Sequence, residues 1–272
     1  MLCPYQNLYI YLIKGVISEN DALSLGHAFI GNWVEDDSSF LFFSEPAGDL
    51  VDILLKTHPE FELVDHYQFT YEQWQGGGLE PVQIESFVIV PYWKDIDIED
   101  SMLKIKLDPG VVFGNGLHPT TKDCIRSLAY AEKERHFNNV LDLGTGTGIL
   151  ALAAALLGAK KVLALDLNPL CVKTAVNNVR INGFNDVIRV LEAPAENMID
   201  EPADLIIANM HYEVISSFLE KRSFQKKERM IISGLMRSQY RDLKMLVKKY
   251  SLRLVHEWEH NITWFTVLVE RD

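Results

Sequence analysis

Cysteine is scarce in the sequence, which has only Cys3, Cys124 and Cys171 among its 272 residues. Their spacings match neither a disulfide framework nor the paired cysteines of a zinc knuckle. This excludes a small protein stapled by disulfides. We therefore expect a reduced protein of the cytoplasm that holds no metal.

Long apolar runs and an excess of positive charge are also missing. No run approaches the about 18 apolar residues of a membrane-spanning helix, and the apolar first segment is interrupted by Gln6, Asn7 and Lys14. We expect that segment to be a strand rather than a signal peptide. The net charge of −12 opposes contact with a phosphate backbone, so we expect neither a membrane nor direct nucleic acid as partner. The acidity favours a basic partner or a small molecule, although solubility alone also accounts for it.

Short strands and helices alternate over residues 1–70, in the order strand, helix, strand, strand, helix, strand. This is the order of a small ferredoxin-like α+β domain. Its first helix is predicted over 18–30, with Ser18 as the cap and Asp21 in the first turn. A loop is predicted over 73–81 because it carries three consecutive glycines and a proline. Residues 71–101 are interpreted as a linker and rim, and the glycines at 76–78 would let the two domains move.

From residue 102 to 272 strands alternate with helices, which predicts an α/β fold with a parallel sheet. The strands are almost continuously apolar, so we expect both faces of this sheet to be covered. The last two segments have no helix between them and should pair antiparallel at one edge. The basic run at 221–229 is predicted as a solvated loop, the alternative being a local anion site. His256 and His260 fall on a predicted strand, where they are too far apart to share a metal.

A glycine run follows one apolar strand, at Gly144, Gly146 and Gly148. The third glycine comes one residue earlier than in the dinucleotide fingerprint G-x-G-x-x-G. Asp142, two residues before the run, would repel a pyrophosphate and suits the cationic amino-acid end of S-adenosylmethionine. Asp166, 22 residues after Gly144, can accept hydrogen bonds from both ribose hydroxyls. The alternative is that the glycines make only a tight turn and that Asp166, Asn168 and Pro169 only cap a helix.

Four segments in order also resemble a known family: LDPGVVFGNGLHPTTKDC, VLDLGTGTGILALAAALLGAKKVLALDLNP, ADLIIANM and IISGLMRSQ. They are similar to the signatures of the PrmA methyltransferases, which methylate lysine and N-terminal amines of a large-subunit ribosomal protein. The resemblance implies a class I methyltransferase domain with a Rossmann-like seven-stranded sheet and a ferredoxin-like substrate-recognition domain. It implies S-adenosylmethionine as cofactor and a ribosomal or other basic protein as partner. It also assigns roles to particular positions: Thr121 over the cofactor, Phe113 and Gly114 closing the pocket, Gly144 at the methionine end, Asp166 on the ribose and Asn209 beside the methyl group.

The sequence departs from the family pattern where the acceptor should enter. Asn115 and Leu117 replace two threonines before HPTT, and Met210, His211 and Tyr212 follow Asn209 in place of Ile-Leu. Two alternatives therefore stay open beside a protein N-methyltransferase. One is a small-molecule methyltransferase on the same fold, and the other is a protein that binds the nucleoside without transferring a methyl group.

Methyl transfer to an amine requires a neutral nucleophile aligned with the methyl group. Asn209 can accept a hydrogen bond from the amine and aim its lone pair. His118 and His211 are candidates for the proton acceptor, although each could instead be a packing or surface residue. Tyr212 could pack on the nitrogen of the substrate, as in Asn-Pro-Pro-Tyr motifs, or be a core tyrosine. The predicted catalytic residues are Asn209, His118 and Tyr212. The residues predicted to bind the cofactor are Phe113, Gly114, Thr121, Asp142, Gly144, Gly146, Gly148, Asp166, Asn168 and Asn209.

Overall fold

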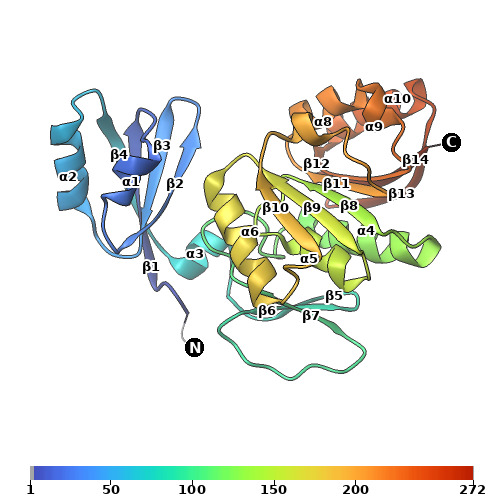
Figure 1. The fold of residues 1–272 in the computed structure, drawn as a ribbon, viewed down its shortest axis with the longest axis horizontal. Helices are drawn as coiled ribbons and strands as arrows, with labels where there is room; N and C mark the ends of the chain where they lie inside the picture. The colour runs from blue at the N-terminus through green and yellow to red at the C-terminus, as the bar shows by residue number, and fades with distance from the viewer. Residues whose placement is uncertain (1–2, 272) are drawn as a thin grey trace. The chain divides into compact units, whose positions relative to one another are not determined.

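The computed structural model describes residues 3–271, and the chain divides into two compact units, Met1–Leu79 and Glu80–Asp272. The elements of the first unit are β1 (Asn7–Lys14), α1 (Glu19–Leu23), β2 (Phe29–Glu35), β3 (Ser38–Phe43), α2 (Gly48–Thr57), β4 (Glu62–Thr70) and α3 (Tyr71–Gln75). Its four strands pair antiparallel in the order β2-β3-β1-β4 (Figure 1). Apolar residues of α1 and α2 form one core with inward residues of β1 and β3. The order of strands and helices predicted for this region is therefore present.

Two local predictions in this unit were wrong. The first helix ends at Leu23 instead of near residue 30, because Gly26 adopts a left-handed φ of 82° and the chain enters β2 at Phe29. Part of the predicted loop over 73–81 belongs to α3. A reciprocal capping box between Thr70 and Gln73 starts this helix, and Gly76, at φ 75°, ends it.

The second unit contains two sheets. A small sheet, of order β5-β6-β7, contains β5 (Val82–Ile84), β6 (Phe87–Pro91) and β7 (Leu103–Leu107). The elements of the main α/β layer are α4 (Pro119–Glu134), β8 (Asn139–Leu143), α5 (Ile149–Leu156), β9 (Lys161–Asp166), α6 (Pro169–Ile181), β10 (Ile188–Glu192), α7 (Ala195–Met198), β11 (Leu205–Asn209), α8 (Tyr212–Leu219), α9 (Arg222–Gln225), β12 (Arg229–Met236), α10 (Arg237–Lys249), β13 (Leu252–His260) and β14 (Trp264–Arg271). The alternation predicted from residue 102 onward is confirmed.

The seven strands of the main sheet follow the order β10-β9-β8-β11-β12-β14-β13. The first five are parallel, and β14 and β13 form the antiparallel edge pair that the sequence predicted. From β8 the chain moves outward through β9 and β10, then returns to place β11 on the other side of β8. In open α/β sheets ligands bind at the carboxyl ends of strands where the order reverses in this way.

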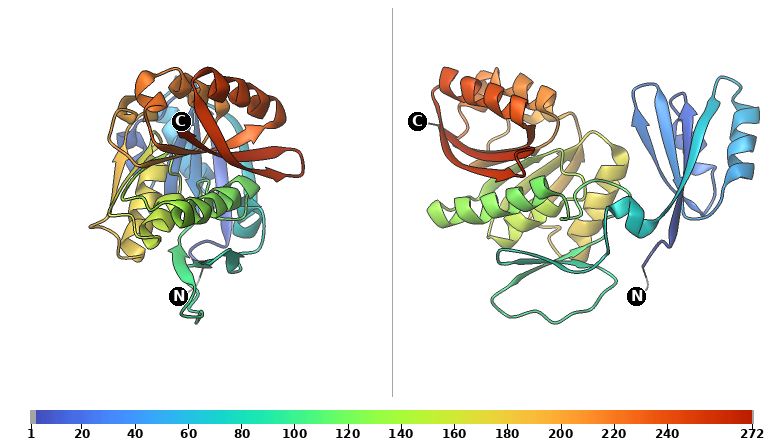
Figure 2. Two further views of the ribbon diagram at one scale, coloured as in Figure 1. Left: turned by 90° about the vertical axis from the view of Figure 1, so that its right-hand side faces the viewer. Right: turned by 180° about the vertical axis from the view of Figure 1, so that it is seen from behind.

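Helices cover both faces of the sheet (Figure 2). Apolar residues of α4, α5 and α6 form one core with one face of the strands, and those of α8, α9 and α10 form a second core with the other face. The sheet is therefore the middle layer of three, which explains why its strands are almost continuously apolar.

The basic run at 221–229 is not the solvated loop that the sequence predicted. Phe224 is fully buried in α9, and Lys227 and Arg229 are also buried. The Arg229 guanidinium donates to Glu270 and to the carbonyls of Ala131 and Arg135. These internal partners satisfy the buried charge, so the run is part of the structure rather than a surface patch. Within residues 3–271, no helix combines the length and apolar character that crossing a membrane requires.

Candidate functional site

A row of residues lies at the carboxyl ends of the parallel strands. Leu143 of β8 is opposite Leu165 of β9 and Ala208 of β11. The next residues, Gly144, Asp166 and Asn209, therefore stand level with one another at the point where the strand order reverses. On the next strand to either side, Glu192 of β10 lies opposite Asp166 and Ser233 of β12 lies opposite Asn209. The structure thus brings together three of the residues that the sequence selected.

The segment 144–148, here called the cofactor loop, is built around glycine. Gly144, Gly146 and Gly148 have φ values of 69°, 56° and 82°, where residues with a Cβ are disfavoured. A Cβ on Gly146 would lie 2.5 Å from the carbonyl oxygen of Phe113, and one on Gly148 would lie 3.2 Å from Cβ of Ala175. The loop therefore needs glycine both for its dihedral angles and for close approach.

Hydrogen bonds fix the shape of the cofactor loop from several sides. The Gly146 amide donates to Oδ2 of Asp166 at 2.9 Å. Thr147 donates through its hydroxyl to the Gly114 carbonyl at 2.6 Å, and its amide donates to the Phe113 carbonyl at 3.1 Å. Phe113 and Gly114 therefore lie against this loop, although they are some 30 residues earlier. The side chain of Asn178 donates to the Thr147 carbonyl at 2.9 Å.

Asp142 lies beneath the cofactor loop. Its side chain is 1% exposed, and Oδ2 accepts a hydrogen bond from the Thr145 hydroxyl at 2.6 Å. Among the described residues, Oδ1 has no hydrogen-bond partner. Burial raises the pKa of Asp142 to about 7, against the opposing effects of the Thr145 hydroxyl and the Ala151 amide dipole. A cationic group nearby would stabilise the ionised form of this buried carboxyl, whose Oδ1 is unpaired.

Asp166 is half-buried and connects two neighbouring segments. Its Oδ1 accepts from the Asn168 amide at 3.0 Å, while Oδ2 holds the cofactor loop. Asn168 is the N-cap of α6, and its side chain accepts from the Leu170 amide. The cap role that the sequence offered as an alternative for Asn168 is therefore present. Next to Asp166, the apolar side chain of Leu167 is 68% exposed.

His118 starts α4 as its N-cap. Nδ1 accepts from the Thr120 amide at 3.3 Å and lies 2.8 Å from the Thr120 hydroxyl. The ring makes edge contacts with Phe113 and Trp264, at centroid distances of 5.3 and 5.1 Å. Burial and the neighbouring His260 lower the pKa of His118, so its ring is neutral at neutral pH.

Thr121, in the first turn of α4, is almost completely buried. Its hydroxyl has no hydrogen-bond partner among the described residues. The side chain predicted to cover the cofactor therefore points into the interior of the protein, next to the loop that carries His118. A buried hydroxyl without a partner is uncommon in native proteins, where nearly all such groups are hydrogen-bonded.

Asn209, the last residue of β11, and the following Met210 and His211 are here called the acceptor loop, after the role predicted for Asn209. Gly234 of β12, at φ 82°, approaches this loop closely. A Cβ there would lie 2.8 Å from the Met210 carbonyl oxygen and 3.5 Å from Oδ1 of Asn209. His211 is exposed and is the N-cap of α8 without a side-chain capping bond. Tyr212, the first residue of α8, is half-buried against the core, and burial and the charge of Asp242 raise its pKa.

The donor set fits S-adenosylmethionine. The buried carboxyl of Asp142 suits the cationic end of the cofactor, and Asp166 is the acidic residue that ends the next strand. The glycines allow Met210, Phe113 and Ala175 to approach the loop more closely than any side chain at 144, 146 or 148 would permit. Four more residues lie at these strand ends or in the loops beside them, and the sequence analysis gave none of them a role: Leu167, Glu192, Met210 and Ser233.

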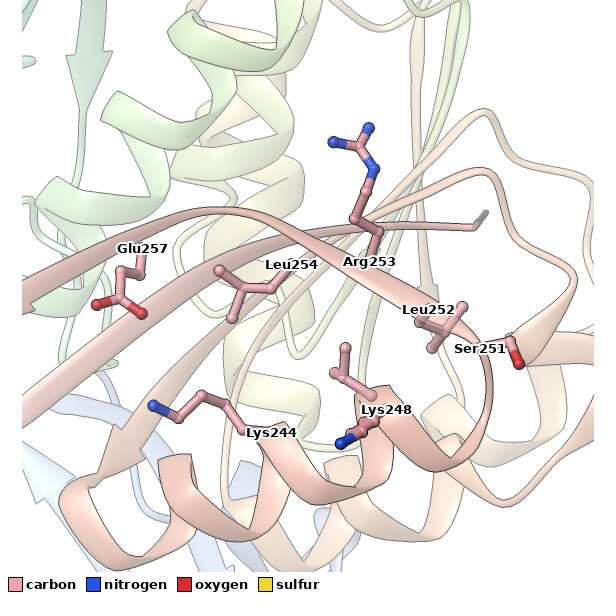
Figure 3. Close-up of a pocket in the computed structure, with 8 residues that line it drawn as sticks. Lys244, Lys248, Ser251, Leu252, Arg253, Leu254 and Glu257 are labelled. Carbon is pink, nitrogen blue, oxygen red and sulfur yellow. The ribbon is translucent and has the colours of Figure 1, made fainter.

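A surface groove between α10 and β13 lies elsewhere (Figure 3). Its Leu252 and Leu254 pair with the last residues of β14, which lie beside the start of β12. The groove is therefore at the amino ends of the parallel strands, away from the row of residues at their carboxyl ends. Arg253 donates to Glu270, and Glu257 accepts from Tyr240. Because these charges already have internal partners, we assign the groove no role.

Comparison with known proteins agrees with this geometry. The family model described as ribosomal protein L11 methyltransferase (PrmA) matches residues 51–272. Ribosomal protein L11 methyltransferases of Anoxybacillus flavithermus and Geobacillus thermodenitrificans are 42% and 41% identical over 168 and 169 residues, each match covering 60% of this chain and 53% of the relative. The chain thus spans about half the length of the curated relatives it matches.

Solved structures give the same class. A ribosomal protein L11 methylase from Lactobacillus delbrueckii subsp. bulgaricus is 28% identical, with a TM-score of 0.63 over 71% of this chain and 98% of that one. The METTL16 methyltransferase domain, 19% identical, has a TM-score of 0.51 over 61% of this chain and 73% of that one, and shows the fold alone. The α/β fold with a seven-stranded sheet is that of class I methyltransferases, as the sequence predicted. Together with a family match over more than three quarters of its length, this shows that the chain belongs to the PrmA family of ribosomal protein L11 methyltransferases.

Proposed function

We propose that this protein is an S-adenosylmethionine-dependent N-methyltransferase whose acceptor is an amine of a ribosomal protein. One observation carries the proposal. Asn209, a polar residue able to accept a hydrogen bond from an amine, stands level with Gly144 on the adjacent strand, at the reversal of strand order. The family to which the chain belongs supplies the reaction class.

The cofactor loop and Asp166 would hold the cofactor. Bound S-adenosylmethionine would supply a methyl group activated by a sulfonium. Asp142 would stabilise positive charge at the methionine end through its field, because its carboxyl is buried beneath the loop. Asp166 would accept hydrogen bonds from the ribose, and the exposed Leu167 beside it offers an apolar surface to the base.

The acceptor amine must lose its proton before it attacks. Oδ1 of Asn209 would accept a hydrogen bond from the amine and hold its lone pair in line. His118 is neutral at neutral pH, and its Nδ1 is engaged with Thr120. The other ring nitrogen, Nε2, would take the proton as a general base. His211 would not serve in this role, since it is exposed and lies outside the row of strand ends.

The identity of the acceptor is the part of the proposal that departs from the family pattern. Asn115 now accepts a hydrogen bond from the Leu117 amide, so that the substituted segment closes a turn of its own. The Met210 side chain lies on Gly144. Because the substitutions fall in the segments expected to admit the acceptor, they support a small-molecule acceptor as the second candidate.

A transfer assay separates these candidates. The purified protein is incubated with S-adenosylmethionine labelled in the methyl group and with ribosomal protein L11, with total ribosomal proteins or with a pool of metabolic amines. We expect label on L11 lysine or N-terminal amines, lost in Asn209→Ala. Label on a metabolite alone would support the second candidate, and cofactor binding with no transfer to any acceptor would contradict both.

A further inference from the structure

Met210 connects the two loops of the site. A Cβ built on Gly144 would lie 2.7 Å from Cε and 3.7 Å from Cβ of Met210. The terminal methyl of Met210 therefore occupies the space above Gly144, at the first residue of the cofactor loop. Because ordinary van der Waals contacts between carbon atoms are about 3.5–4.0 Å, the two residues touch directly and leave no room for a side chain at position 144.

The main chain of Met210 is held from the opposite side. A Cβ on Gly234 would lie 2.8 Å from the carbonyl oxygen of Met210 and 3.4 Å from its amide nitrogen. Ser233, the neighbour of Gly234, lies opposite Asn209 in the β11–β12 pair. Its hydroxyl hydrogen-bonds to that of Thr266 at 2.5 Å. Met210 is thus fixed between Gly144 and a rigid, buried part of the sheet.

We propose that Met210 is a positioning residue that couples the cofactor loop to the acceptor loop. Its side chain packs on Gly144, so it must move when Gly144 moves, and its main chain is bonded directly to Asn209, the preceding residue. A displacement of the cofactor loop is therefore transmitted to the amide that orients the acceptor. The thioether suits this task, because methionine is unbranched and adapts its shape to the surface it covers. The inference deepens the proposed function, on which it rests, by naming how the two halves of the site are aligned.

The contact can be tested with a double-variant cycle on cofactor binding. Gly144→Ala places a Cβ against Cε of Met210 and strains a left-handed residue, so it should weaken S-adenosylmethionine binding by about thirtyfold or more. Met210→Ala removes the obstructing methyl group but not the strain. The double variant should therefore bind about tenfold more tightly than Gly144→Ala alone.

Gly148→Ala is the matched control. Gly148 has a similar φ of 82°, but its added Cβ would meet Ala175 instead of Met210. Met210→Ala should leave the affinity of this variant unchanged within about twofold. The coupling would be overturned if the Gly144→Ala variant gained nothing from Met210→Ala, or if Gly148→Ala gained as much. The thermal unfolding midpoints of these variants, measured without ligand, give a second test. Met210→Ala should raise the midpoint of Gly144→Ala but not that of Gly148→Ala.

Turnover distinguishes positioning from a structural role. For Met210→Ala we expect kcat to fall about tenfold while the dissociation constant of the cofactor changes less than about threefold. Met210→Leu conserves volume and should restore kcat to within about threefold of the wild type. An unchanged kcat in Met210→Ala would contradict the proposal. Failure of the wild type to bind S-adenosylmethionine would instead overturn the proposed function, so the two failures are distinguishable.

Discussion

The cofactor loop and the acceptor loop follow adjacent strands, yet different forces fix them. Side-chain hydrogen bonds hold the cofactor loop: Asp142 accepts from Thr145, Asp166 accepts from Gly146, and Thr147 donates to Gly114. The acceptor loop is instead fixed by close packing of Met210 between two glycines. Its His211 starts α8 without a side-chain capping bond.

The two kinds of contact suit the two roles proposed for these loops, which are binding the cofactor and orienting the acceptor. In the proposed function the cofactor loop holds one ligand, and its directional hydrogen bonds would lower the free-energy cost of binding by preorganising the loop. Packing contacts can be altered by exchanging one side chain for another of similar volume. The acceptor loop can therefore change in sequence while the cofactor loop keeps its shape, which agrees with where this chain departs from the family pattern.

Asn209→Ala tests the acceptor side with the largest expected effect. Loss of the amide should lower kcat about 10²–10³-fold, because the amine is no longer oriented. The dissociation constant of S-adenosylmethionine should change less than about threefold. Labelled methyl transfer and calorimetry on the same samples give both numbers. Asn177→Ala, on α6, is the matched control and should change neither quantity. Equal losses of cofactor binding and turnover in Asn209→Ala would contradict the separation of the two loops.

Asn178→Ala tests the cofactor side. Asn178 is fully buried, donates to the carbonyls of Thr147 and Asp108 and accepts from the Asp108 amide. Its removal leaves these groups unpaired and should lower the free energy of unfolding by about 2–4 kcal/mol. Denaturant titration measures the loss. The neighbouring Asn177→Ala removes two hydrogen bonds near the surface, one to Asp108 and one from Arg180, and should cost less than about 1 kcal/mol.

The pKa of Asp142 gives the cofactor loop a pH dependence. Because this pKa is raised from 3.8 to about 7, the stability it contributes is present below pH 3.8 and is lost as the pH rises to about 7. A cationic ligand favours the ionised form, so affinity for S-adenosylmethionine should fall by up to about tenfold per pH unit below 7. Asp142→Asn should bind with no such slope. Calorimetry between pH 5.5 and 8 tests this, and a slope that persists in Asp142→Asn would contradict the assignment.

His118 gives the smallest expected effect on stability. Replacing this N-cap by alanine should lower the free energy of unfolding by about 1 kcal/mol. Its pKa in the folded state is lowered from 6.5, so its contribution to stability is present above pH 6.5 and is lost as the pH falls below that value. His118→Asn keeps a capping side chain and removes the titration. Unfolding titrations should show an acid-side loss in the wild type that is absent from His118→Asn.

The sequence predicted best those features that depend on neighbouring residues, such as tight turns and helix caps. The tight turn at Gly144, Gly146 and Gly148 and the helix cap at Asn168 were both named from the sequence, because glycine dihedral angles and helix caps leave direct signatures in the chain. Tertiary contacts escaped prediction. Lys227 and Arg229 are charged but buried, since Arg229 has Glu270 and two carbonyls as distant partners.

The acceptor side shows the same limit. Met210 looked like a departure from a motif, and only the structure places its methyl group on Gly144. The first helix ends at Leu23 because Gly26 turns the chain. The prediction gave more weight to the apolar pattern of 18–30 than to this glycine. Packing between segments far apart in sequence has no local signature, so these features could not be derived from the chain alone.

The most direct test of the central claim is calorimetric titration of S-adenosylmethionine and, separately, NADH into the purified wild type and Asp166→Ala. We predict micromolar binding of S-adenosylmethionine to the wild type, at least about a hundredfold weaker in Asp166→Ala, and no binding of NADH. Binding of NADH without S-adenosylmethionine would contradict the account, because the cofactor loop would then hold a pyrophosphate above a buried carboxyl.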